Sequence, residues 1–134
     1  MVFILIRLFD RRNKVSDTIN FNSKFKLFSE FWSPRVIAEM NNYQFKLVKI
    51  KGEFIWHNHE DTDEVFIVIK GTMGIEFKDR KIELNEGEMI VVKKNIDHKP
   101  FAKNECQVLL VEPKGTINTG NAGGELTSEN NIWI

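Results

Sequence analysis

Hydrophobic and polar positions follow a helical period at the start of the chain and a strand-like period afterwards. Near the N-terminus, aromatic residues recur at helical spacing, at Phe25, Phe28, Phe31 and Trp32. Ser23 occupies a position suited to an N-cap, and Pro34 ends the run. The pattern therefore predicts one short helix ahead of residue 34.

From Arg35 onward, short runs rich in β-branched and aromatic residues alternate with turn residues such as Gly52, Gly71 and Lys103-Asn104. Nine strands are expected, over residues 36–40, 43–50, 53–57, 64–70, 72–77, 82–84, 88–92, 99–102 and 106–111. No helical pattern separates them, which is typical of an antiparallel sandwich or barrel. We therefore predict an all-β fold with one short N-terminal helix.

The length of 134 residues predicts one domain, and 42% hydrophobic residues are enough for one core. We expect an extension over residues 1–14, a domain over 15–114 and a tail over 115–134. The tail is rich in Gly, Asn and Thr and ends in Ile132-Trp133-Ile134, so we expect it to fold back onto the domain.

The extension has an apolar run over residues 2–6, followed by Arg7, Arg11, Arg12 and Lys14. This order is the reverse of a secretory signal, and the run is too short to span a membrane. An extra strand, an oligomer arm and a poorly ordered extension all fit it, and we favour the last two.

Charge and cysteine content exclude several classes of protein. The 19 basic and 19 acidic side chains cancel, so there is no electrostatic reason to expect nucleic acid or an anionic membrane as a partner. The single cysteine, Cys106, excludes an internal disulfide and suits a reducing compartment, so we expect a cytoplasmic protein. Cys106 alternates with Val108 and Leu110, which predicts a buried and inert thiol.

The three histidines of the chain fall into one arrangement with a carboxylate. His57 and His59 are two residues apart, so both rings project from the same face of a strand. Glu64 begins an apolar run, where an unpartnered carboxylate would be costly, and a neighbouring strand could bring His98 beside it. Three imidazoles and one carboxylate suit divalent Fe, Mn, Ni, Co, Cu or Zn.

Two spaced motifs contain these residues. Gly52-x4-His57-x-His59-x4-Glu64-x6-Gly71 resembles the first cupin motif, and Gly87-x5-Lys93-x-Asn95-x2-His98-x3-Ala102 resembles the second. Lys93, Asn95 and Ala102 stand where proline, glycine and asparagine are common, which affects turn geometry and leaves the ligands in place. The chain is also similar to small single-domain bacterial cupins described as mannose-6-phosphate isomerase-like, a label for fold rather than activity.

The resemblance implies a cupin double-stranded β-helix, which is a jelly-roll barrel of two antiparallel sheets with a metal ion near one mouth. The implied ligands are His57, His59, Glu64 and His98. Strand parity places Phe66 and Val68 on the same face as Glu64. Trp56 and Phe101 are further candidates for lining the pocket, although plain core packing is the favoured explanation for those two.

The function is open between an enzyme and a binding protein at this point. A metal-dependent enzyme would act on a small oxygen-rich metabolite, with dioxygenase-type or sugar isomerase or epimerase-type chemistry. Its weakness is the lack of a proton-transfer group, for which only Glu53 and Tyr43 are candidates. The alternative is a metal-dependent module that binds or senses a small molecule without turnover, and a structural zinc site fits less well. Because both faces of the strand beginning at Glu64 are apolar, we also expect a homodimer.

Overall fold

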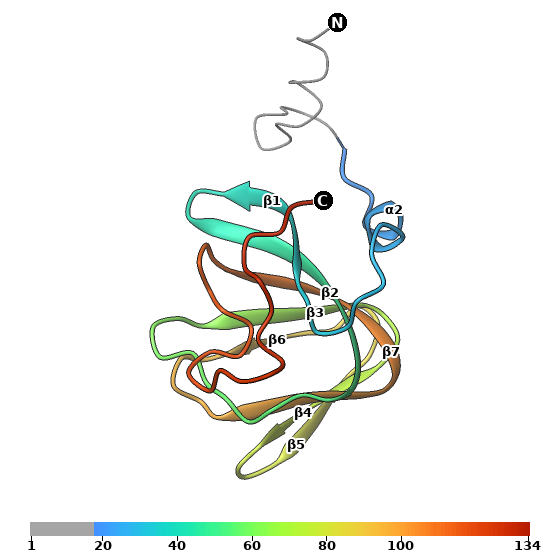
Figure 1. Cartoon of the computed structure of the whole chain (residues 1–134). Coiled ribbons are helices and arrows are strands. Elements are labelled where there is room, and N and C mark those ends of the chain that lie inside the picture. The colour runs from blue at the N-terminus through green and yellow to red at the C-terminus, as the bar shows by residue number, and fades with distance from the viewer. Residues whose placement is uncertain (1–17) are drawn as a thin grey trace, which may run out of the picture.

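A computed structural model of the chain describes residues 18–134 (Figure 1). The predicted extension over residues 1–14 lies outside the described residues. The described part contains one α-helix, α2 (Phe21–Phe25), followed by strands only. These are β1 (Arg35–Met40), β2 (Tyr43–Glu53), β3 (Glu64–Lys70), β4 (Met73–Phe77), β5 (Lys81–Leu84), β6 (Met89–Val92) and β7 (His98–Pro113).

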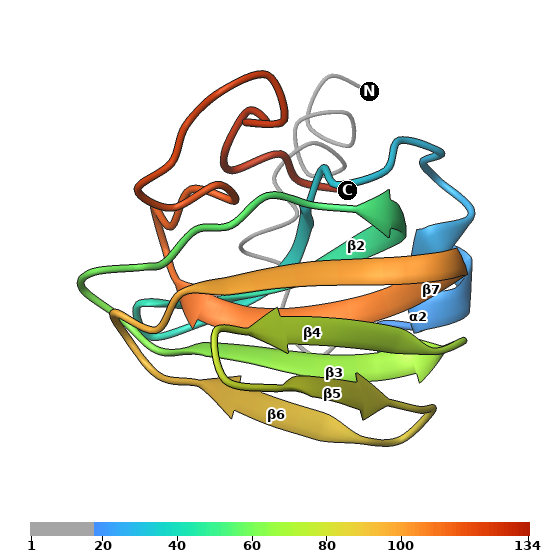
Figure 2. The same ribbon diagram turned by 90° about the horizontal axis from the view of Figure 1, so that it is seen from below.

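The strands pair antiparallel and form two layers because the longest strand, β7, belongs to both. Its later residues lie between β2 and β3, in a sheet with the order β1-β2-β7-β3-β6. Its first residues, 98–101, pair with β4, which in turn pairs with β5. Figure 2 shows β7, in orange, alongside these partners. The all-β jelly-roll prediction is therefore confirmed.

The main hydrophobic core is formed by alternate residues that face between the layers. It includes Phe66 and Val68 of β3, Ile75 of β4, and Val108 and Leu110 of β7, all at most 6% exposed. The period of two in each strand sends every second side chain into this space. The same alternation directs the candidate site residues on β3 and β7 inward.

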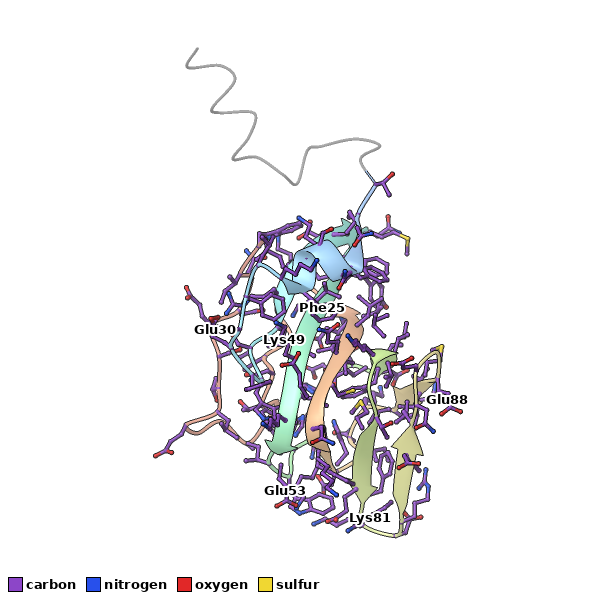
Figure 3. All side chains as sticks on the ribbon, turned by 90° about the vertical axis from the view of Figure 1, so that its right-hand side faces the viewer. Phe25, Glu30, Lys49, Glu53, Lys81 and Glu88 are labelled. Atoms are coloured by element: carbon purple, nitrogen blue, oxygen red, sulfur yellow. The ribbon has the colours of Figure 1, made fainter. Side chains whose placement is uncertain are left out.

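A second hydrophobic cluster covers the outer face of the larger sheet. Phe25 and Phe28 pack against Leu47 of β2 and Leu109 of β7. In Figure 3, Phe25 lies between α2 and these strands. The helix therefore works as a cover for one sheet face, which explains why its aromatic residues are buried.

The predicted helix is displaced toward the N-terminus. Asn20, rather than Ser23, is the N-cap, and its side chain accepts a hydrogen bond from the Ser23 N–H at 2.8 Å. The chain leaves the helix after Phe25, because Phe31 forms a bridge with Lys49 and Trp32 donates its N–H to the Lys49 carbonyl at 2.8 Å. Pairing with β2 therefore replaces the helical hydrogen bonds that the aromatic spacing predicts.

Two strand predictions were also wrong. The runs at 99–102 and 106–111 form one strand with no turn at Lys103-Asn104, since β2 pairs with β7 on both sides of these residues, at Ala102 and at Cys106. It changes layer at a register shift opposite Ile50 and Gly52. The run at 53–57 is not a separate strand, because β2 ends at Glu53 and His57 makes only an isolated bridge with His98.

Residues of the expected tail contact the barrel at its edge. Ile132 accepts a hydrogen bond from the Val36 N–H at 2.7 Å, and Ile134 donates to the Val36 carbonyl at 3.1 Å. The end of the chain thus lies against β1. In the described residues, the one helix is far too short to cross a membrane.

Candidate metal centre

Four buried side chains converge at one end of the space between the two sheets. His57 and His59 lie in the segment after β2, Glu64 is the first residue of β3, and His98 is the first residue of β7. One nitrogen or carboxylate oxygen from each lies within 4.8 Å of those from the others. All four are at most 7% exposed, so the fold gathers four donors away from bulk water.

Backbone hydrogen bonds hold the ligand-bearing segments together. The His57 N–H donates to the His98 carbonyl at 3.1 Å, and the His98 N–H donates back at 2.9 Å. The neighbouring side chains add a second link, since Asn58 Nδ2 donates to Asp97 Oδ1 at 2.8 Å. The histidines from the two motifs are therefore fixed relative to each other by the residues beside them.

The imidazole rings are oriented with their Nε2 atoms toward the centre of the cluster. His57 Nδ1 lies 2.9 Å from the Ile55 carbonyl, and His98 Nδ1 lies 2.8 Å from the Ile96 carbonyl. A carbonyl can only accept, so in each ring Nδ1 is the donor and Nε2 of a neutral ring keeps a free lone pair. The Nε2 atoms of His59 and His98 are buried without a hydrogen-bond partner. Such atoms fit a bound cation.

The protonation states also suit a cation. Burial, followed by the nearby His98, lowers the pKa of His57 to about 4, so that ring is neutral at pH 7. Burial alone would raise the pKa of Glu64, but the side chain of Glu112, together with the neighbouring His59 and His98, brings it well below the ordinary value. A neutral imidazole and an ionised carboxylate are the forms that bind metal ions.

A second pair of buried ionisable residues lies behind Glu64. Val65 pairs with Val111 and Phe66 with Leu110, so the register places Glu64 opposite Glu112. Glu112 accepts from Lys46 Nζ at 3.0 Å, and both side chains are at most 3% exposed.

Burial, together with the charge of Glu64, raises the pKa of Glu112 well above its ordinary value, although Lys46 opposes the rise. The raised pKa favours the protonated form of Glu112, which is the form that can donate a hydrogen bond to the Glu64 carboxylate.

A cavity of about 40 Å³ adjoins the cluster. His57 and Glu64 form its polar wall, and Phe66 lies in the apolar wall with residues from β2 and β7. Trp32 and Pro34 contribute from the segment before β1, and Asn118 contributes from the tail. The cluster is thus open on one side to a small, partly open and mainly apolar space.

The model of the cupin domain matches residues 46–112, a span that contains all four clustered residues. The chain belongs to the cupin family. A cupin-2 domain containing protein from Shewanella frigidimarina has a similar structure, with 62% identity and a TM-score of 0.72 over 72% of this chain and 95% of that one. Protein NMB1881 from Neisseria meningitidis is 35% identical, with a TM-score of 0.67 over 73% of this chain and 100% of that one.

The uncharacterized protein YdbB of Bacillus subtilis is 34% identical over 79 residues, which cover 58% of this cupin and 70% of YdbB. These likenesses establish the family and its barrel fold. The narrower mannose-6-phosphate isomerase-like grouping stays a prediction.

The other residues singled out in the sequence lie apart from the cavity wall. Val68 is 1% exposed and belongs to the main hydrophobic core. Phe101 covers Gly74 on β4, where a Cβ atom would come within 2.2 Å of its ring. Trp56 is half-buried, with Lys78 Nζ 4.0 Å from its ring centre. Of the four pocket candidates, only Phe66 lines the cavity beside the cluster.

The two candidates for proton transfer are on the surface. Glu53 is the last residue of β2, its side chain is 71% exposed, and it forms an ion pair with Lys99 at 3.0 Å. Figure 3 shows it at the end of the strand away from α2. Tyr43 is 47% exposed at the start of the same strand, where it pairs with Met40 and Pro113. Neither side chain lines the cavity.

Sequence reasoning missed the polar residues that support the cluster. Lys46 and Glu112 had a signal, because each shares the parity of inward-facing apolar residues, Val48 on β2 and Leu110 on β7. Two opposite charges at inward positions of neighbouring strands suggest a buried pair. Asn118 had no comparable signal, since the tail shows no periodicity.

Proposed function

We propose that this cupin binds one divalent transition-metal ion through His57, His59, Glu64 and His98. The observation that supports this most directly is the pair of buried, unpartnered Nε2 atoms on His59 and His98, which face a carboxylate within 3.6 Å. Three nitrogen donors and one oxygen donor accept Fe, Mn, Ni, Co, Cu or Zn.

We further propose that the cavity beside the cluster receives a small molecule that presents oxygen atoms to the ion. A bound ion would act as a Lewis acid toward those oxygens, and a redox-active ion would also support reaction with dioxygen. The chain itself contributes the mainly apolar wall beside the ion, and the neutral His57 and ionised Glu64 that keep the ion in place.

Between the two proposed chemistries, the cavity favours dioxygenase-type over sugar isomerase-type reactions. An isomerase or epimerase has to move a proton at carbon, which requires a positioned base. In the part of the chain that the structure describes, His57 and Glu64 are the only titratable groups in the cavity wall, and both belong to the cluster. The same observation supports the second candidate, a module that binds a small molecule without turnover.

The first test is the metal content of the purified protein. We expect about one transition-metal ion per chain, and we expect His57→Ala and His98→Ala to lose it while their circular dichroism stays that of a β-protein. Glu60→Gln is the matched control, because Glu60 is an exposed acid in the same segment. Full metal content in both histidine variants would contradict the ligand assignment.

The second test separates the two functions. Oxygen consumption by the iron-loaded protein is measured with a panel of diketones, acireductones, thiols and flavonols. Uptake that depends on one of them supports the dioxygenase, whereas binding of a compound without uptake supports the non-catalytic module.

The proposal includes a homodimer formed through the outer face of β3 and β6. Ile67 pairs with Met89 and Val65 with Val91, and all four side chains point away from the barrel core. Met89 is 55% and Val91 41% exposed, so a second copy would remove apolar area from water.

A further inference from the structure

The cavity beside the metal cluster has few groups with which a polar ligand could interact. Apart from His57 and Glu64, its wall is apolar except for Asn118. Both N–H donors of Asn118 are in use, because Nδ2 donates to the carbonyls of Trp32 at 3.0 Å and Leu126 at 2.9 Å, and Oδ1 accepts from the Ser128 N–H at 2.9 Å. Away from the cluster, a ligand therefore meets mainly apolar surface and no side-chain donor in this wall.

No cationic side chain is available in this wall among residues 18–134. The nearest buried cation behind it, Lys46, is occupied by Glu112 Oε1 at 3.0 Å and the Thr116 carbonyl at 3.3 Å. A phosphate or carboxylate placed in the cavity away from the cluster would lose its hydration without gaining a partner. The cavity thus discriminates against a second charged group on the ligand.

Trp32 lines the cavity in an unusual backbone conformation. Its φ is +61°, in the left-handed region that a bulky residue rarely adopts. Three contacts hold it there besides Asn118: its N–H donates to the Lys49 carbonyl, its indole Nε1 donates to the Lys51 carbonyl at 3.0 Å, and its ring stacks on Phe54 at 4.7 Å. Because these contacts hold Trp32 in an otherwise unfavourable conformation, the loss of one of them is expected to change its position.

The tail that carries Asn118 also lies directly on the metal cluster. Gly120 has a φ of +53°, and a Cβ atom there would come 2.1 Å from the Asn58 carbonyl oxygen and 3.3 Å from the His57 ring. Asn121 continues the contact, since its N–H donates to the Asn58 carbonyl at 3.0 Å and its Oδ1 accepts from the Asn58 N–H at 2.9 Å. Asn118 therefore sits in a tail that is fastened over the cluster.

We infer that the cavity takes the apolar part of a small ligand that has no charge outside its metal-binding group, and that Asn118 keeps Trp32 in the wall that this part contacts. This inference rests on the proposed function, because it assigns a ligand class to the same site. A volume of about 40 Å³ holds roughly three water-sized groups. An alkyl chain of about three carbons therefore fills the cavity, and the rest of a longer chain lies beyond the apolar wall.

The test uses alkyl hydroxamic acids as probes, since each carries the same chelating group on a different chain. The full-length protein is loaded with Co(II), its metal content is measured, and Kd is obtained from the visible absorption of the cobalt. We expect butyrohydroxamic acid to bind at least tenfold more tightly than succinic monohydroxamic acid, which ends in a carboxylate, and more tightly than octanohydroxamic acid. Equal binding of the carboxylate-ended probe would overturn the ligand class.

The role of Asn118 is tested with the ratio of the Kd values for octano- and butyrohydroxamic acid. We expect Asn118→Ala to lower this ratio at least tenfold, whereas Ser128→Ala, a neighbour that contacts Asn118 only through its backbone, keeps the wild-type ratio. An unchanged ratio in Asn118→Ala would overturn the role of Asn118. If that variant does not fold, Asn118→Ser, which stays neutral but offers one donor instead of two, allows the same comparison.

A metal-free measurement keeps this inference separate from the proposed function. Xenon is titrated into the metal-free protein while the methyl signals of Val48, Ile50 and Leu110 are followed by NMR. Saturable shifts at these methyls support an apolar cavity even if cobalt fails to bind, in which case only the metal proposal fails. The absence of shifts in a protein that does bind cobalt would overturn the cavity assignment alone.

Discussion

At the scale of single residues, the pKa of each buried ionisable group depends on the groups next to it. Glu64 and Glu112 are both carboxyl groups at most 4% exposed, yet their pKa values move in opposite directions. The difference arises because the side chain of Glu112 and the neighbouring His59 and His98 stabilise the charge of Glu64, whereas burial and the charge of Glu64 disfavour ionisation of Glu112. One carboxyl is therefore available to a cation, and the other supplies a hydrogen bond.

Lys46→Met is expected to lower the free energy of unfolding of the metal-free protein by about 2 kcal/mol, since it leaves a buried oxygen of Glu112 without a donor. Glu112→Gln is the matched variant. A glutamine still accepts from Lys46 and donates to Glu64, so we expect a change below about 1 kcal/mol. Urea unfolding followed by circular dichroism measures both, and a larger loss in Glu112→Gln would show that Glu112 is ionised.

Cys106 is expected to react slowly with iodoacetamide in the folded protein. Its side chain is fully buried, and burial, together with the charge of Glu86, raises the pKa of the thiol to about 11. Because only the thiolate attacks, the rise from 9.0 reduces the reactive fraction at pH 8 about a hundredfold. Mass spectrometry compares the native rate with that in urea, and equal rates would contradict a buried thiol.

At the scale of elements, β7 joins the two layers, and the ring of its residue Phe101 also covers Gly74 of β4. Gly74 pairs with Phe101, whose ring lies over the space that a side chain at position 74 would occupy. Glycine weakens a strand because it has no side chain to pack, and a cross-strand aromatic ring compensates for this. The contact explains why Phe101 belongs to the outer surface of the barrel rather than to the ligand cavity.

Gly74→Ala is expected to destabilise the protein by about 1 kcal/mol, because the new methyl group displaces the ring of Phe101 toward solvent. The double variant Gly74→Ala/Phe101→Ala should be less destabilised than the sum of its single variants, as the clash disappears with the ring. Urea unfolding of the three variants gives the coupling, and strict additivity would mean that the two residues do not interact.

The helix and β7 show which element predictions fail and why. The aromatic spacing at residues 25–32 satisfies a helix, yet Phe31 and Trp32 pair with β2 instead, a contact between residues far apart in the sequence. Lys103 and Asn104 have the composition of a turn, but partners on both layers keep β7 extended. Local preference is overridden in both cases by hydrogen bonds to another strand.

At the scale of the whole molecule, the outer faces of the larger sheet are covered unequally. Phe25 and Phe28 cover Leu47 and Leu109, whereas Met89 and Val91 at the other end remain exposed. The exposed strand β6 pairs only with β3, so it is also an edge of the sheet. A second copy of the chain would bind at this end of the sheet.

We expect light scattering at micromolar concentration to show a dimer, and the double variant Met89→Lys/Val91→Lys to be a monomer, because charges in a desolvated interface have no partners. Glu83→Lys on β5 changes the charge at an exposed position of the other layer and serves as the control. A monomeric wild-type protein would refute the homodimer.

The sequence by itself determined the fold class and the grouping of His57, His59, Glu64 and His98, because these depend on strand alternation and on spacing within two short motifs. Only the tertiary structure decided that Glu112 faces Glu64, that Lys46 is buried beside it, and that Trp32 and Asn118 line the cavity. These contacts depend on strand register and on the path of a tail without periodicity. Residues adjacent in the chain specify neither the register nor the path of the tail. These contacts can therefore be identified only in the folded structure, where distant segments lie together.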